Sequence, residues 1–156
     1  MPEPQFVALD VKFLADLEIG YVPAQGKFDD LNRSFYFLVT STPLQELADA
    51  QLNSNDEMVR DLSKFVLRDY KLWGVLDPAL APAYNGVAEI IASTLISKGI
   101  IPDDQIDDGL VIAEAALHGC KRLVTHRTSL RDANFGNLSR ILFDHSVVCP
   151  IIDFFA

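Results

Sequence analysis

The feature that most constrains the fold of this chain is the alternation of short apolar runs with longer segments of helical periodicity. The runs 6–9, 35–39 and 123–125 are rich in aromatic, β-branched and leucine side chains, which is typical of strands buried on both faces. Between them, apolar residues recur every three or four positions, which predicts amphipathic helices. Since strands that alternate with such helices form parallel sheets, we expect an α/β fold with helices on both faces of the sheet.

Helix starts and ends are predicted from proline, glycine and polar residues. Thr42-Pro43 is typical of a helix start with Thr42 as the N-cap, which places Glu46 in the first turn. Gly119 is expected to end a later helix. The other predicted segments are helices over 11–20, 56–70, 80–98 and 108–118, a loop over 26–30, and short strands over 72–76 and 147–149. The sequence leaves open whether the apolar tail 151–155 completes the last strand or docks on a partner.

The length and composition predict one folded domain over 1–156. The chain has no repeat and no linker, and with 49% apolar and 22% charged residues it has a globular rather than a disordered composition. Cys120 and Cys149 are expected to be reduced core thiols, because two cysteines without a secretory signal do not make a disulfide framework. We expect a cytoplasmic protein with no membrane partner, since no apolar run reaches about 18 residues.

The chain is acidic, which limits how it meets nucleic acid. Its 13 Lys and Arg residues against 22 Asp and Glu residues give a formal charge of −9, which repels RNA at long range and requires any RNA contact to be local. Four basic residues at spacings of 4, 4 and 3 share one helical face and could follow an RNA backbone, although a solvated face with ion pairs to nearby acids is favoured. They are Arg60, Lys64, Arg68 and Lys71.

Three acids occupy equivalent places in the predicted sheet. Asp10 follows the first strand, Glu46 follows the second, and Asp108 begins the helix before a later strand. If the strands are neighbours, these carboxylates lie close together and repel one another unless a cation neutralises them. Mg²⁺ or Mn²⁺ suits such an all-oxygen set and could activate a water for attack on a phosphodiester. The alternative is that the acids only cap helices.

The order of these segments resembles the PIN-domain nucleases, which include the VapC-type toxin ribonucleases of bacterial toxin–antitoxin pairs. The clearest stretch is 99–127, with an Ile-Ile-Pro lead, an acidic helix from Asp108, Gly119 eleven residues later and a Leu-Val-Thr strand. The stretch 6–10 resembles the family's first strand with its leading Asp, and 39–47 resembles the second strand and the helix with its Glu.

The resemblance implies a three-layer α/β/α sandwich around a central, mainly parallel sheet. It also implies a metal-dependent ribonuclease that cleaves single-stranded RNA with Mg²⁺ or Mn²⁺. Asp10 and Asp108 would then be the principal metal ligands, Glu46 would complete the catalytic site, and a metal-bound water would attack phosphorus. The implied partners are single-stranded RNA, an antitoxin protein that covers the cleft, and a second copy in a homodimer.

Two basic residues depart from the family's pattern. Lys12 stands in the polar pair that usually follows the first Asp, and Arg127 stands at or near the fourth acidic position. Either could pair with a carboxylate and weaken metal binding, or Arg127 could bind nucleic acid by contacting the scissile phosphate. His126, beside this position, is a candidate general base. The rival hypothesis is therefore a catalytically degenerate PIN-like binding or regulatory module; a more distant one is an α/β domain with another small-molecule role.

Overall fold

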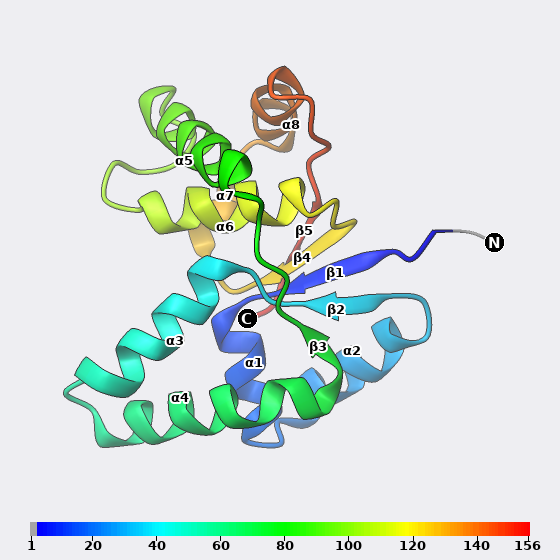
Figure 1. Ribbon diagram of the computed structural model, residues 1–156, viewed down its shortest axis with the longest axis vertical. Helices are drawn as coiled ribbons and strands as arrows, with labels where there is room; N and C mark the ends of the chain where they lie inside the picture. The colour runs from blue at the N-terminus through cyan, green and yellow to red at the C-terminus, as the bar shows by residue number, and fades with distance from the viewer. Residues whose placement is uncertain (1–2) are drawn as a thin grey trace.

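Short strands alternate with helices along the chain, as the apolar pattern predicts (Figure 1). The computed structural model describes residues 3–156. In chain order the elements are β1 (Phe6–Leu9), α1 (Val11–Glu18), α2 (Val22–Asn32), β2 (Tyr36–Leu38), α3 (Ser41–Asn53), α4 (Glu57–Asp69), the 3₁₀ helix η1 (Tyr70–Trp73), β3 (Val75–Leu76), α5 (Pro82–Ser97), α6 (Ile106–Leu117), β4 (Arg122–Thr125), α7 (Thr128–Asp132), α8 (Phe135–Asp144) and β5 (Ile151–Phe154).

The strands form a parallel sheet with β1 in the middle. The order is β3-β2-β1-β4-β5, and every neighbouring pair runs parallel. Ala8 of β1 is in register with Leu38 on one side and with Leu123 on the other. Because all five strands point the same way, their carboxyl ends share one edge, which is where open α/β sheets bind ligands.

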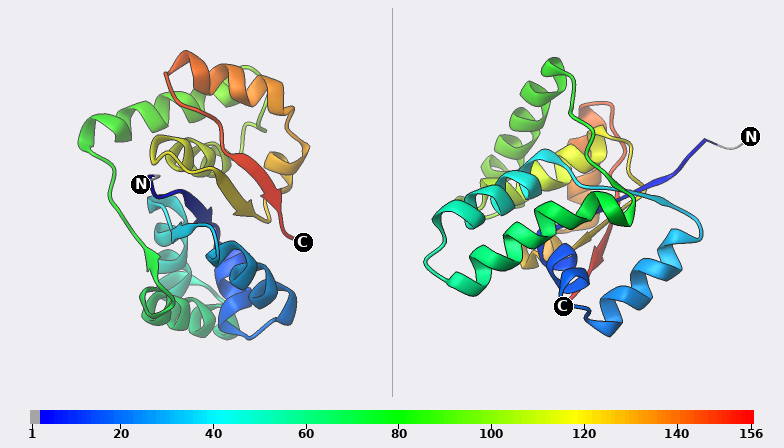
Figure 2. Two further views of the ribbon diagram at one scale, coloured as in Figure 1. Left: turned by 90° about the vertical axis from the view of Figure 1, so that its right-hand side faces the viewer. Right: turned by 60° about the horizontal axis from the view of Figure 1, so that its bottom comes forward.

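Helices cover both faces of the sheet. Successive side chains of β1 point to opposite faces, so that Val7 and Leu9 enter the core beside α1, α2, α3 and α4, whereas Ala8 enters the core beside α5, α6 and α8. Figure 2 shows the sheet between these two helical layers. The predicted three-layer α/β/α sandwich is confirmed.

The acidic helix α6 packs very closely against α5. A Cβ atom on Gly109 would lie 3.0 Å from both Cα and Cβ of Ala92, so glycine is what allows this approach. The helix begins at Ile106, two residues before the predicted start, and Asp108 lies in its first turn. Gly119 follows the helix with a φ of +72°, a conformation that favours glycine and confirms the predicted helix end.

The predicted loop over 26–30 is wrong, because these residues lie inside α2. Pro23 occupies the first turn, where a missing N–H is tolerated. Ala24 and Phe28, one turn apart, are buried, and the Phe28 ring stacks on that of Phe37 with centroids 4.3 Å apart. Burial of this apolar face outweighs the low helix propensity of Gly26.

The predicted strand over 147–149 is also wrong. Val147 and Cys149 pack against the core from a loop, and the last strand is β5, which lies in the apolar tail. Pro150 has no N–H to donate, so pairing begins at Ile151, whose N–H donates to the carbonyl of Lys121 over 2.9 Å. Of the two alternatives for the tail, completion of the sheet is correct.

Both cysteines are buried and free, as expected. Burial raises the pKa of Cys120 to about 12 and that of Cys149 to about 11, so neither is a reactive thiolate near neutral pH. In the chain from residue 3 onward, none of the helices has both the length and the apolar character that a membrane span requires.

Candidate functional site

The structure brings the three predicted acids together around a single arginine at the carboxyl edge of the sheet. Asp10 follows β1 and caps α1, Glu46 lies in the second turn of α3, and Asp108 lies in the first turn of α6. Arg127 follows β4 and contacts all three carboxylates. We call these four residues the acidic cluster.

The guanidinium of Arg127 uses all three of its nitrogens on this cluster. Nε donates to Oδ2 of Asp10 over 2.7 Å and Nη2 donates to Oδ1 over 3.0 Å, which makes a two-pronged pair. Nη1 donates to Oδ1 of Asp108 over 2.8 Å, and Nη2 also donates to Oε1 of Glu46. The sequence leaves two roles open for Arg127, pairing with a carboxylate or contacting a phosphate. In the structure it pairs with the carboxylates.

Asp10 is held rigidly from several sides. Its side chain is fully buried, and the backbone N–H of Val11 donates to Oδ1 over 2.8 Å. The hydroxyl of Thr125 donates to Oδ2 over 2.6 Å and accepts from the N–H of Arg127 over 3.1 Å. Thr125 thus connects the end of β4 to the acid at the end of β1, a role that the sequence analysis did not assign to it.

Asp108 has a second partner besides Arg127. The hydroxyl of Ser129, in the first turn of α7, donates to Oδ2 of Asp108 over 2.5 Å. Ser129 and Arg127 therefore satisfy one oxygen each. Ser129 could have been recognised as a partner of the acids from its position two residues after Arg127, in the polar segment that follows β4.

Burial and charge act in opposite directions on these groups. Burial alone would raise the pKa of Asp10, but the hydrogen bonds and charge of Arg127 outweigh it and hold that pKa below the ordinary value. For Glu46, burial prevails over Arg127 and raises the pKa. Burial would lower the pKa of Arg127, yet its bonds to Asp10 and the two other acids raise it, so the guanidinium stays charged.

A buried acid outside the acidic cluster, Glu114, fixes the helix that carries Glu46. Thr42 is not the N-cap of α3, because the helix begins at Ser41, two residues before the predicted start, and Thr40 is the N-cap without a side-chain bond. Glu114 of α6 supplies the missing acceptor: its Oε1 accepts the N–H of Thr42 over 2.9 Å, and its Oε2 accepts the Thr42 hydroxyl over 2.6 Å. Asp108 and Glu114 thus tie α6 to the site and to α3.

The other candidate residues lie around the cluster without joining it. Lys12 pairs with Asp16, one turn along α1, at 3.1 Å rather than with a clustered acid. Nδ1 of His126 accepts the N–H of Lys12 over 3.3 Å, and burial lowers the pKa of this histidine, so it is neutral near pH 7. Its general-base role stays a prediction.

The arrangement does not fit a divalent cation. Between residues 3 and 156, no group of three or more His, Cys, Asp or Glu side chains is arranged to hold a metal ion. Oxygens of Asp10 and Asp108 accept hydrogen bonds from guanidinium nitrogens at 2.7–3.0 Å, so Arg127 occupies the positions from which a cation would contact them. Arg127 fills the space between the predicted ligands, so these residues are not placed as a metal shell.

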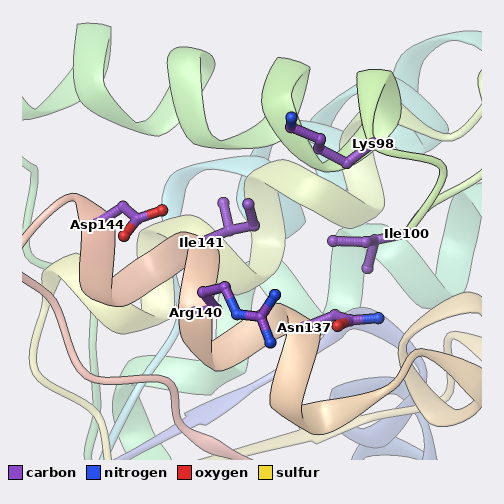
Figure 3. A pocket seen from close by; sticks show the side chains of 6 residues that line it. All are labelled: Lys98, Ile100, Asn137, Arg140, Ile141 and Asp144. Carbon is purple, nitrogen blue, oxygen red and sulfur yellow. The ribbon is translucent and has the colours of Figure 1, made fainter.

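Two cavities on the surface differ in their relation to the cluster. One of about 350 Å³ adjoins it and is lined by Glu46, Asp49 and Asp107 together with polar and apolar neighbours. Another, of about 320 Å³, lies between the end of α5 and α8 and includes no clustered residue. Figure 3 shows that Lys98 and Arg140, which line it, point in different directions rather than toward a common ligand position.

The fold is a three-layer α/β/α sandwich around a parallel sheet, with the acidic cluster at the carboxyl edge of that sheet. No family model matches the chain, and no curated protein matches it by sequence. Among solved structures, it is similar to a chain of the VapBC2 complex from Rickettsia felis bound to a DNA fragment from their promoter, with a TM-score of 0.66. The match covers 97% of this chain and 100% of the other at 15% sequence identity, so it shows a common fold. The resemblance found in the sequence is confirmed at that level.

Proposed function

We propose that this chain is a PIN-like binding or regulatory module whose acidic site is closed by Arg127. The observation that carries the proposal is the set of four bonds from one guanidinium to three carboxylates. Hydrolysis of a phosphodiester by a metal-bound water needs a metal ion that coordinates the water and lowers its pKa. A guanidinium has only N–H donors and cannot coordinate the oxygen of a water in this way. Arg127 is also engaged by the acids, so it is not free to hold a phosphate.

A protein partner is the ligand class that the fold favours. The similar chain from Rickettsia felis was solved in a complex, VapBC2, on promoter DNA. By analogy we propose that this chain binds an antitoxin-like protein. The formal charge of −9 argues against a direct, nonspecific contact with DNA or RNA, because both would be repelled at long range.

A second candidate, the metal-dependent ribonuclease, is favoured by the convergence of Asp10, Glu46 and Asp108. Their proximity supports the catalytic roles that the resemblance to PIN nucleases implies for them, and single-stranded RNA would be the substrate. This function requires Arg127 to leave the cluster. Its side chain is 9% exposed, so the guanidinium would have to exchange three ion pairs for solvent.

Cleavage of a mixed single-stranded RNA panel separates the two candidates. The purified chain, free of copurified partner, is incubated with Mn²⁺, Mg²⁺ or EDTA beside Asp10→Asn. We expect no cleavage that depends on metal. Cleavage that needs metal and disappears in Asp10→Asn would contradict the binding module and establish the nuclease. Equal cleavage by the native chain and by Asp10→Asn would come from a contaminating nuclease, and the cleavage seen with the variant is subtracted as background.

A further inference from the structure

We propose that Cys120 and Cys149 form a site of oxidation, at which a small-molecule disulfide converts the two thiols into one internal disulfide bond. Cys120 lies two residues before β4 and Cys149 lies two residues before β5, at the amino edge of the sheet. Arg127 lies beyond the other end of β4. The site is therefore separate from the acidic cluster and goes beyond the proposed function.

The register of the two strands places the cysteines opposite each other. Arg122 of β4 is paired with Ile151 of β5, and the strands run parallel. The residues two positions back along each chain are Cys120 and Cys149. Between these two positions, the N–H of Ile151 donates to the carbonyl of Lys121 over 2.9 Å. Neighbouring strands lie about 4.7–4.9 Å apart, which is within the span of about 4.4–6.8 Å between Cα atoms that a disulfide requires.

Both thiols enter the same core. Cys120 is 4% exposed and Cys149 is 9% exposed, and both belong to the apolar core beside α5, α6 and α8. They also line one cavity of about 430 Å³, whose walls include residues 119–121 and 146–149. Because the two side chains border one space rather than opposite faces of the sheet, their sulfur atoms can meet without a rearrangement of the strands.

Cys149 is the better placed of the two to react first. It lies in the loop between α8 and β5, where Ser146 has a φ of +64°, in the left-handed region that strains residues other than glycine. The backbone of Cys120 is fixed at the end of α6, since its N–H donates to the carbonyl of Ala115 over 3.0 Å. Burial raises the pKa of Cys149 to about 11 and that of Cys120 to about 12, so Cys149 has the larger thiolate fraction.

The reaction transfers two electrons from the protein to the oxidant. The Cys149 thiolate attacks one sulfur of the small-molecule disulfide, forming a mixed disulfide and releasing one small thiolate. The Cys120 thiolate then attacks the sulfur of Cys149, forming the internal disulfide and releasing the second small thiolate. The two protons lost by the protein thiols balance the two small thiolates. Because both pKa values are raised, the rate should increase as the pH rises above 7.

The test is oxidation of the native chain in glutathione buffers at about pH 8.5, near the pKa of an unperturbed thiol, followed by alkylation and peptide mass mapping. We expect one peptide pair linked through Cys120 and Cys149. The disulfide encloses residues 121–148 and restricts the unfolded chain, so the unfolding temperature should rise by about 5–15 °C and fall back with dithiothreitol. Disulfides between two chains, or glutathione retained on either cysteine as the end product, would overturn the proposal.

The same titration in concentrated urea distinguishes pairing by the fold from chance pairing. Both titrations are followed to equilibrium, starting from the reduced and from the oxidised chain. At a fixed concentration of the glutathione thiol, we expect half-oxidation of the folded chain at a concentration of glutathione disulfide at least about tenfold lower than in urea. An equal or higher concentration for the folded chain would overturn the proposal, because the fold would then not bring the thiols together.

Cys120→Ala and Cys149→Ala are the matched control variants. Each keeps one thiol and cannot form an internal disulfide, so the oxidant should leave its unfolding temperature unchanged. A rise as large as that of the native chain in either variant would overturn the proposal. If a variant does not fold, the peptide map and the two titrations of the native chain still decide the outcome, because they require no substitution.

Discussion

Arg127 and Arg68 make the same kind of bond in very different surroundings. Each forms a two-pronged pair with an aspartate in which Nε lies 2.7 Å from a carboxylate oxygen, Arg127 with Asp10 and Arg68 with Asp69. The Arg68 side chain is 63% exposed, on the basic face of α4. The Arg127 side chain is 9% exposed, and that of its partner Asp10 is fully buried. The comparison teaches that burial, rather than hydrogen-bond geometry, decides how much each arginine contributes to the free energy of unfolding.

The physical reason is the solvent around each pair. Exposed ion pairs contribute about 0–1 kcal/mol, since water screens them and both side chains lose freedom. Removing one member of a buried pair leaves an uncompensated charge and costs about 3–5 kcal/mol. Of the four basic residues on the predicted face, Arg68 pairs with Asp69, and Lys71, in the 3₁₀ helix η1 that follows α4, pairs with Asp77 at 3.5 Å.

The largest effect is expected for Arg127→Ala in the absence of divalent metal. Since it leaves three acids together and one of them fully buried, it should lower the free energy of unfolding by about 3–5 kcal/mol. Urea denaturation followed by circular dichroism at pH 7 measures this. A loss below about 1 kcal/mol would place Arg127 in the same class as Arg68.

A smaller decrease in the free energy of unfolding is expected for Glu114→Ala. The substitution leaves the N–H of Thr42 without an acceptor at the start of α3, which costs about 1–3 kcal/mol. Glu114→Gln should recover part of the loss, because its amide oxygen can still accept that N–H. Glu89→Ala, on the exposed face of α5, is the matched control; a loss equal to that of Glu114→Ala would refute the capping role.

The pH dependence of stability should separate Asp10 from Glu46. Because the folded pKa of Asp10 is below its unfolded value, its contribution is present above about pH 4 and is lost as the pH falls further. Glu46 has a raised folded pKa, so its contribution is present below about pH 4 and is lost as the pH rises through the folded value. Asp10→Asn should flatten the dependence of the free energy of unfolding on pH below about pH 4. Glu46→Gln should flatten it above about pH 4. Identical curves for both variants would contradict these opposite signs.

The smallest effect is expected for Arg68→Ala. Because the Arg68 side chain is 63% exposed, its pairs with Asp69 and, at 3.9 Å, with Glu18 should contribute little to the free energy of unfolding, and salt should reduce that contribution further. Urea denaturation at low and high salt measures the difference. A loss comparable to that of Arg127→Ala would show that burial does not govern the comparison.

The sequence predicted the parts of the fold that depend on local pattern. The apolar run of β1, the helix end at Gly119 and the convergence of Asp10, Glu46 and Asp108 follow from strand composition, glycine conformation and the common edge of a parallel sheet. The alternation of strands and helices also predicted helices on both faces of the sheet.

The errors and omissions depend on contacts between distant residues. The helix over Gly26 forms because Phe28 is buried against Phe37, and the last strand is displaced because Pro150 cannot pair. Glu114 accepts bonds from Thr42, 72 residues away, so no local capping pattern could reveal it. Arg127 was recognised as a departure, but its choice among the carboxylates requires the tertiary structure.

Diffraction at the manganese absorption edge, from crystals of the native chain soaked in Mn²⁺, tests the central claim most directly. The account predicts guanidinium density of Arg127 between Asp10 and Asp108 and no anomalous peak among the three carboxylates. An anomalous peak bonded to Asp10, with Arg127 turned out of the cluster, would contradict it and would make the metal-dependent nuclease the function to pursue.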